Sequence, residues 1–138
     1  MKFSIKVQYG LQAMLELALN YGGGPVQIKT IAKDQKIPVR FLEQLLLVLK
    51  RAGLIASIRG KNGGYSLAKR PSEISVLSVI EAFEGPIELA TKKMKKTPVL
   101  FEAFDKIQVG FKKQLSLLTL EELALKQRQA DLSINYQI

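Results

Sequence analysis

Apolar residues recur at helical spacing through the first third of the chain, and their pattern predicts three amphipathic helices. The first is predicted over Lys6–Asn20, because the glycines and proline of Gly22–Pro25 break the pattern. A shorter helix is predicted over residues 26–35, beginning at the first or second of them. The third is predicted to begin at Pro38, since a first helical position tolerates proline, and to be capped by Gly53.

Two short β-favouring segments follow, Leu54–Arg59 and Tyr65–Ala68, and the glycines between them allow the positive φ angles of a hairpin loop. Beyond Pro71, Ser75 is the predicted N-cap of a helix over Val76–Glu84. The predicted order is that of a winged helix-turn-helix, in which a helix, a tight turn, a second helix and a hairpin follow one another. The predicted fold is therefore mainly α with a small β-hairpin.

The last third of the chain carries a longer apolar pattern. Residues 98–118 are predicted to form one long helix whose apolar positions approximate a heptad seam. A second apolar side of this helix exceeds what one small domain requires, so a partner helix from a second subunit is expected to cover it. The alternative is packing within one subunit. The seam residues are Leu100, Phe104, Ile107, Phe111 and Leu118.

These elements divide the chain into three predicted parts. Residues 1–85 form the winged helix-turn-helix domain, residues 86–97 a mobile linker with little apolar periodicity, and residues 98–138 a helical dimerisation region. Within the last part, Thr119 and Glu122 form a capping-box pattern for a final helix of about ten residues. Residues 127–138 are expected to be a frayed tail.

Charge is distributed unevenly between the two halves of the chain. Residues 1–70 contain twelve Lys or Arg and three Asp or Glu, whereas residues 71–138 contain nine of each. The formal net charge of +9 therefore resides in the predicted winged-helix half. A basic domain with this order of elements indicates binding to double-stranded DNA.

Composition excludes several kinds of chemistry. The chain has no cysteine and no histidine, which rules out disulfides, thiolate-bound zinc or iron–sulfur clusters, and Cys- or His-dependent nucleophilic catalysis. Its carboxylates are scattered and no phosphate-binding loop precedes a helix, so we expect no metal, no cofactor and no enzymatic activity. No segment is apolar enough for a membrane helix or a signal peptide, which predicts a cytoplasmic location.

The third helix carries the candidate base-reading residues. Arg40, Glu43 and Gln44 lie on one polar stripe near its start, opposite the apolar stripe of leucines. In a major groove, arginine can bind guanine, glutamine can bind adenine and glutamate can accept from cytosine. The alternative is that this stripe is polar only because it is exposed, as on any surface helix. The position of this helix directly after a tight turn favours base reading. Leu47 on the same stripe could contact a thymine methyl or pack under the wing, and we favour packing.

The loop of the hairpin, or wing, supplies a second candidate contact. Arg59 is predicted to enter a minor groove, whose narrow form concentrates negative potential; the alternative is an ordinary charge beside a turn. Other polar residues are candidates for phosphate contacts, which fix register without reading sequence. They are Lys2, Lys6, Gln8, Tyr9, Lys29, Thr30, Lys61, Asn62 and Gly63.

Several short motifs together resemble one family over nearly the whole chain. The chain is similar to the Rrf-two (Rrf2) family of bacterial winged-helix regulators, whose members include the iron–sulfur sensor IscR, the nitric-oxide sensor NsrR and the cysteine-metabolism repressor CymR. The motifs are Met1-Lys2-Phe3-Ser4-Ile5-Lys6 with Tyr9, Ala13-Met14-Leu15, Phe41-Leu42-Glu43-Gln44-Leu45, Ala52-Gly53-Leu54, Ser57-Ile58-Arg59-Gly60 with Gly63-Gly64-Tyr65, and Ile80-Glu81-Ala82-Phe83-Glu84-Gly85.

The resemblance also shows a departure. Cluster-binding members have cysteines in the segment that corresponds here to Leu89–Phe104, and this chain has none. The resemblance therefore points to members without a cluster, among which a metabolic enzyme can act as corepressor.

These observations predict a sequence-specific DNA-binding transcriptional regulator. We expect a homodimeric repressor on a near-palindromic operator, without an iron–sulfur cluster, in sulfur, cysteine or iron–sulfur metabolism. The alternative is a winged-helix module that binds RNA or an acidic protein. A small-molecule or protein corepressor is compatible with the sequence, which does not identify one.

Overall fold

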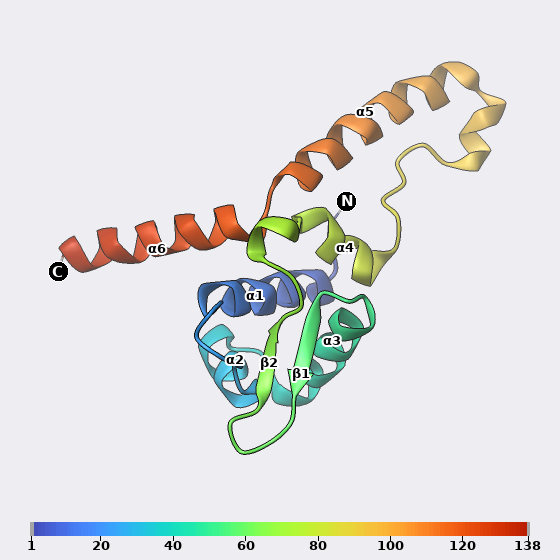
Figure 1. Ribbon diagram of the computed structural model, residues 1–138. Coiled ribbons are helices and arrows are strands. Elements are labelled where there is room, and N and C mark those ends of the chain that lie inside the picture. Colours follow the sequence, from blue (N-terminus) through green and yellow to red (C-terminus); the bar gives the residue numbers. More distant parts are fainter. Residues whose placement is uncertain (1, 138) are drawn as a thin grey trace.

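A computed structural model describes residues 2–137 and shows a helical body with a two-stranded hairpin, from which two helical arms extend (Figure 1). The body begins with α1 (Ile5–Leu19), α2 (Ile28–Gln35) and α3 (Val39–Arg51). All three predicted helices are confirmed, with ends that shift by one or two residues. Pro38 is the N-cap of α3 and not its first residue, because its ψ of 132° is extended.

The turn between α2 and α3 is closed by a left-handed residue. Lys36 has φ 55° and ψ 48°, which lets the chain reverse within two residues. Ile37 then turns inward, and its N–H donates to the Ala32 carbonyl at 3.0 Å. The core beneath this turn is formed by buried side chains of all three helices: Met14, Ile31, Leu42, Leu46 and Leu49.

The hairpin consists of β1 (Ile55–Ile58) and β2 (Gly64–Leu67), paired antiparallel with Ile55 opposite Leu67. Val26 and Tyr65 exchange two N–H···O=C bonds of 2.8 Å, which attach the segment before α2 to the wing. Gly64 permits this approach, because a Cβ there would lie 2.5 Å from the Val26 carbonyl oxygen. The sequence pattern allows a helix start at Val26 and therefore does not predict this bridge.

A short 3₁₀ turn, η1 (Pro71–Glu73), leads to α4 (Val76–Glu84), whose predicted bounds and Ser75 N-cap are confirmed. The Ser75 hydroxyl accepts the Ser78 N–H at 3.1 Å. Helix α4 packs against α1 at Gly10, where a Cβ would lie 2.3 Å from the Phe83 ring. Gly10 is therefore required for close packing of these two helices.

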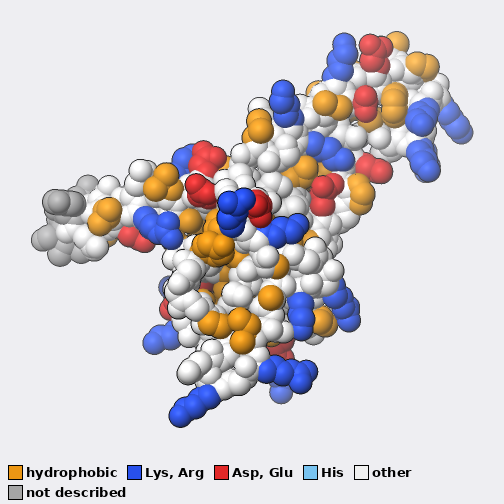
Figure 2. Space-filling view, viewed as in Figure 1, with side chains coloured by type: hydrophobic (Ala, Val, Ile, Leu, Met, Phe, Trp, Pro, Cys, Tyr) orange, Lys and Arg blue, Asp and Glu red, His pale blue; other side chains and the backbone are white. Residues whose placement is uncertain are grey.

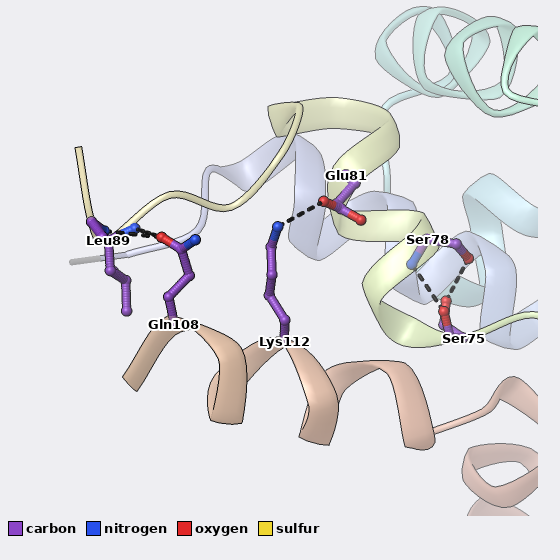
Figure 3. A network of polar contacts seen from close by, with 7 residues as sticks. Ser75, Ser78, Glu81, Leu89, Gln108 and Lys112 are labelled. Carbon is purple, nitrogen blue, oxygen red and sulfur yellow. Dashed lines mark hydrogen bonds and ion pairs between the residues drawn. The ribbon is translucent and has the colours of Figure 1, made fainter. Parts of the chain in front are cut away.

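After α4 the chain passes through η2 (Lys92–Lys96) into α5 (Pro98–Leu117) and α6 (Leu120–Gln137). The side-chain oxygen of Gln108 in α5 accepts the backbone N–H groups of Leu89 and Ala90 (Figure 3). Lys112 lies 3.9 Å from Glu81 of α4. These contacts attach both the connecting segment and α4 to the long helix.

The expectation of a final helix of about ten residues followed by a frayed tail is wrong, because α6 continues to Gln137. Thr119 caps the helix as predicted, its hydroxyl accepting the Glu122 N–H at 3.2 Å. Leu120 and Ala124 are buried against the body, which anchors the first turns. Between residues 2 and 137 no helix is long and apolar enough to cross a membrane.

Candidate nucleic-acid interface

The outer face of α3 presents the three predicted base-reading side chains together. Arg40, Glu43 and Gln44 are all exposed and occupy positions i, i+3 and i+4 of the helix. The inner face of α3 is buried in the core, which fixes the orientation of the outer one. Leu47 continues the stripe with 47% of its surface exposed, so the expectation that it packs under the wing is wrong.

The wing carries Arg59, Lys61 and Asn62, all of them exposed. Gly63 is buried and its N–H donates to the Gly60 carbonyl at 3.0 Å, so that it shapes the loop. A side chain could not replace it, because a Cβ would lie 2.2 Å from the Ile58 carbonyl oxygen. The wing is therefore a tight loop whose charged side chains are exposed.

A groove connects the first turn of α2 to the wing. It has a volume of about 560 Å³, and its lining includes Lys29 and Arg59. Thr30 is exposed on the same turn of α2. The structure thus brings together candidate residues that lie thirty positions apart in the sequence.

The candidates at the start of α1 are placed differently from one another. Lys2, Lys6 and Gln8 are exposed. Tyr9 is half-buried, and its ring meets the Phe41 ring of α3 edge to face at 5.7 Å. Tyr9 therefore supports the first turn of α3, next to Arg40, in addition to any contact of its hydroxyl.

Positive charge gathers on this end of the molecule. Figure 2 shows Lys and Arg side chains around the wing and the adjoining side of the body. The ion pairs that the structure contains within residues 2–137 do not involve Arg40, Arg59 or Lys61. These cations are therefore available to an external anion such as a phosphate.

One supporting residue was not identified from the sequence. The Lys50 ammonium near the end of α3 donates to the Ser57 hydroxyl of β1 at 2.7 Å. This bond joins the recognition helix to the wing, so that the two candidate DNA contacts are held in one unit. No local sequence signal marks the pair, because the two residues lie seven positions apart on either side of a turn.

The candidate dimer residues divide into two groups. Leu100, Phe104 and Ile107 are exposed on α5, and Phe111 is half-buried. Leu118 lies after the end of α5 and packs in its own chain against Val7, Val76 and Ile80, while its carbonyl accepts the Val76 N–H at 2.8 Å. Leu118 thus differs from the other four residues, because α5 ends one residue before it. Its place on an intersubunit seam stays a prediction.

Donor groups for a transition metal are scarce. The sequence has neither cysteine nor histidine, and no group of three or more acidic side chains comes together in residues 2–137. The segment between α4 and α5 is held instead by the amide of Gln108.

Comparisons with known proteins agree with this geometry. A sequence model of the Rrf2 family, described as "Iron-dependent Transcriptional regulator", matches residues 3–126. The chain is 40% identical to the HTH-type transcriptional regulator CymR of Bacillus subtilis (strain 168), over 90% of each chain. It is 36% identical to the HTH-type transcriptional regulator IscR of Cronobacter sakazakii, over 96% of this chain and 86% of the relative.

Solved structures of transcriptional regulators also superpose on this chain. CymR (YrzC), called the global cysteine regulator of B. subtilis, superposes with a TM-score of 0.76 at 38% identity, covering 91% of this chain and 98% of its own. IscR of T. potens superposes with a TM-score of 0.78 at 36% identity, covering 94% of this chain and 90% of its own. The predicted winged-helix fold class is confirmed.

Proposed function

The chain belongs to the Rrf2 family of transcriptional regulators, and we propose that it is a homodimeric repressor that binds a near-palindromic operator. The observation that carries this proposal is the exposed face of α3, where Arg40, Glu43 and Gln44 lie together beside a basic wing. A recognition helix in this setting inserts its N-terminal residues into the major groove. Bound at a promoter, the dimer would exclude polymerase.

Each part of the interface has a separate role in the proposal. Arg40 and Gln44 read base edges, and Glu43 accepts from a cytosine amino group or excludes other bases. Arg59 enters the adjacent minor groove. Lys29, Lys61 and the start of α1 bind phosphates, which positions the helix but carries no sequence information.

The exposed apolar stripe of α5 supports the dimer. No residue of α5 is buried in the single chain, and Ile107 has 57% of its surface exposed. A helix with apolar residues at near-heptad spacing is stabilised when a second copy covers them. Twofold symmetry then places two recognition helices on the same side of the duplex, at half-sites of a palindrome.

Iron dependence does not fit this chain. The family description refers to iron, but the thiolate and imidazole donors of an iron–sulfur site are absent from the sequence. We therefore propose regulation without a cluster. The similarity to a global cysteine regulator favours a role in sulfur or cysteine metabolism, with a protein or small molecule as corepressor.

Selection of genomic DNA fragments by the purified protein, followed by sequencing, tests the proposal and identifies the operator. A salt titration on the selected operator then measures the number of neutralised phosphates, because log K falls with log salt at about 0.9 per phosphate. We expect a steep slope and strong preference over scrambled DNA. A module that binds RNA or an acidic protein would select no common site.

A further inference from the structure

A cavity lies where the body meets the second arm, away from the candidate DNA interface. It has a volume of about 490 Å³, within the usual range for small-molecule sites. Three segments form its walls: the end of α1 with Tyr21, the start of η1, and the first half of α6. The lining combines two arginines, one glutamate, two hydroxyl groups and small apolar side chains, and none of these has a role in the DNA contacts described above.

The two guanidinium groups have hydrogen-bond donors to spare. Arg70 binds Glu73 through Nε and Nη2 at 3.0 and 2.6 Å, but its side chain remains 70% exposed. Arg128 donates from Nη2 to the Leu19 carbonyl at 3.2 Å. Since a guanidinium has five N–H groups, each arginine can also receive a carboxylate.

Glu121 supplies the opposite charge in the same cavity. Glu121 and Arg70 line the same cavity. Glu73 is the main cause that raises the pKa of Arg70, and Glu121 makes a smaller contribution in the same direction. Ser72 and Tyr21 add hydroxyl groups, while Ala18 and Ala124 form an apolar floor. The site thus offers two cations, one anion and a short hydrocarbon surface.

We propose that this cavity binds an acidic α-amino acid, or a metabolite with the same two carboxylates and one ammonium, as an effector of operator binding. The two carboxylates pair with Arg70 and Arg128, and the ammonium pairs with Glu121. The short carbon chain between them lies over the alanines. The regulatory part of this proposal rests on the proposed function, whereas the binding part does not.

The position of the cavity connects it to the wing. Arg70 follows the end of β2 by three residues, so the wing strand leads directly into the cavity wall. Tyr21 also lines a second cavity that reaches Ile58 and Tyr65 of the hairpin. A ligand that bridges Arg70 and Arg128 would therefore fix the base of the wing relative to α6.

Isothermal titration calorimetry of the full chain without DNA tests the binding part. The probes are L-glutamate and L-aspartate, each compared with the matched dicarboxylate that lacks the ammonium, glutarate or succinate. We expect one of the two amino acids to bind with a Kd of about 1 mM or tighter, and its matched dicarboxylate to bind at least about tenfold more weakly. Glu121→Gln should reduce that difference.

Arg128→Gln should weaken binding of the preferred amino acid about tenfold or more, because one charged pair is lost. Lys126→Gln is the matched control: it removes the same charge from the same helix, its ion pair is with Glu122, and it lies outside the cavity. Arg128→Gln also loses the hydrogen bond to the Leu19 carbonyl. If that loss unfolds the variant, Arg70→Gln provides an independent test of the site. The preferred amino acid should also shift operator affinity of the wild type and of Lys126→Gln, but not of Arg128→Gln.

Two results would overturn the site: neither amino acid binds below about 10 mM, or the folded arginine variants bind as the wild type does. Binding without any shift in operator affinity would overturn the regulatory part. Failure of the protein to select or bind any operator, both with and without the amino acid, would instead overturn the proposed function, so the two failures are distinguishable.

Discussion

The side-chain amide of Gln35 donates a hydrogen bond to Glu16 Oε2 at 3.1 Å, joining the last residue of α2 to a buried position of α1. Gln12 adds a second connection, from its side-chain nitrogen to Gln35 Oε1 at 3.4 Å. Gln35 immediately precedes the left-handed Lys36 that turns the chain into α3. The orientation of the recognition helix therefore depends in part on a half-buried polar contact with α1.

Glu16 makes the stability of this contact sensitive to pH. Only 7% of Glu16 is exposed, and burial raises the pKa of its carboxyl above the ordinary 4.5; the nearby Asp34 raises it further. A raised pKa means that Glu16 stabilises the fold fully below pH 4.5 and that this contribution is lost as the pH rises through the folded-state pKa. Glu16→Gln should flatten the pH dependence of the free energy of unfolding, measured by urea denaturation from pH ~4 to ~8.

The control is Glu16→Ala, which removes the acceptor that Gln35 uses. It should lower the free energy of unfolding by about 1–3 kcal/mol relative to Glu16→Gln at every pH, since neither variant titrates at this position and the half-buried Gln35 amide loses its partner. An unchanged pH dependence in Glu16→Gln would show that other carboxyl groups account for it.

Base-reading and phosphate-binding residues should respond differently to substitution. Arg40→Ala or Gln44→Ala should weaken the binding free energy for the operator by about 1–3 kcal/mol, because the contact with a particular base pair is lost. Binding to scrambled DNA should change little. Lys61→Ala should weaken binding to both DNAs equally. It should also reduce the slope of log K against log salt by about 0.9, the value for one phosphate contact. Fluorescence anisotropy on both duplexes at several salt concentrations measures these effects. Equal losses on both DNAs for Arg40→Ala would contradict its base-reading role.

The apolar stripe of α5 should control the oligomeric state. Ile107→Glu places a charge at an exposed apolar position, so a dimer that buries it should dissociate, halving the mass seen by sedimentation equilibrium. Operator affinity should fall sharply, because only one half-site is then bound. Ser116→Glu is the control: it adds the same charge on the opposite side of α5 and should leave the dimer intact. A wild-type monomer at micromolar concentration would exclude this assembly.

The body of the fold could be predicted because each signal in it is local. Helix α4 has the predicted bounds since Ser75 and Gly85 mark its ends chemically. The length of α6 could not be predicted in this way, because it contacts distant parts of the chain: Leu120 and Ala124 are buried against the body, and Arg128 donates to the Leu19 carbonyl further along the helix. The Val26–Tyr65 bridge escaped prediction for the same reason, as the two residues are far apart in sequence.

In the candidate interface, too, the features set by local sequence could be predicted and those set by tertiary contacts could not. The exposed stripe of α3 follows from helical periodicity, and exposure of the wing residues follows from the glycine-rich loop. The Lys50–Ser57 bond and the packing of Tyr9 on Phe41 depend on tertiary contacts that periodicity does not contain. Leu118 fits the heptad pattern, but the pattern does not show that α5 ends at Leu117 and that Leu118 packs against its own chain.

Gln108 is expected to hold the segment between α4 and α5 in place. Its side-chain oxygen accepts two backbone N–H groups, from Leu89 and Ala90, at 2.5 and 2.9 Å (Figure 3). Gln108→Ala leaves both donors without this partner and should lower the free energy of unfolding by about 1–3 kcal/mol. Hydrogen exchange of these two amides should accelerate more than that of amides in the α1–α3 core.

Gln108→Glu separates the role of the acceptor from that of side-chain size. A carboxylate retains an oxygen for both N–H groups, so this variant should keep the two amides protected, whereas Gln108→Ala should not. Because α5 carries the proposed dimer surface, loosening of this segment should also weaken dimerisation and operator binding in Gln108→Ala. If the alanine variant keeps wild-type protection at Leu89 and Ala90, the segment is held by its apolar contacts and not by Gln108.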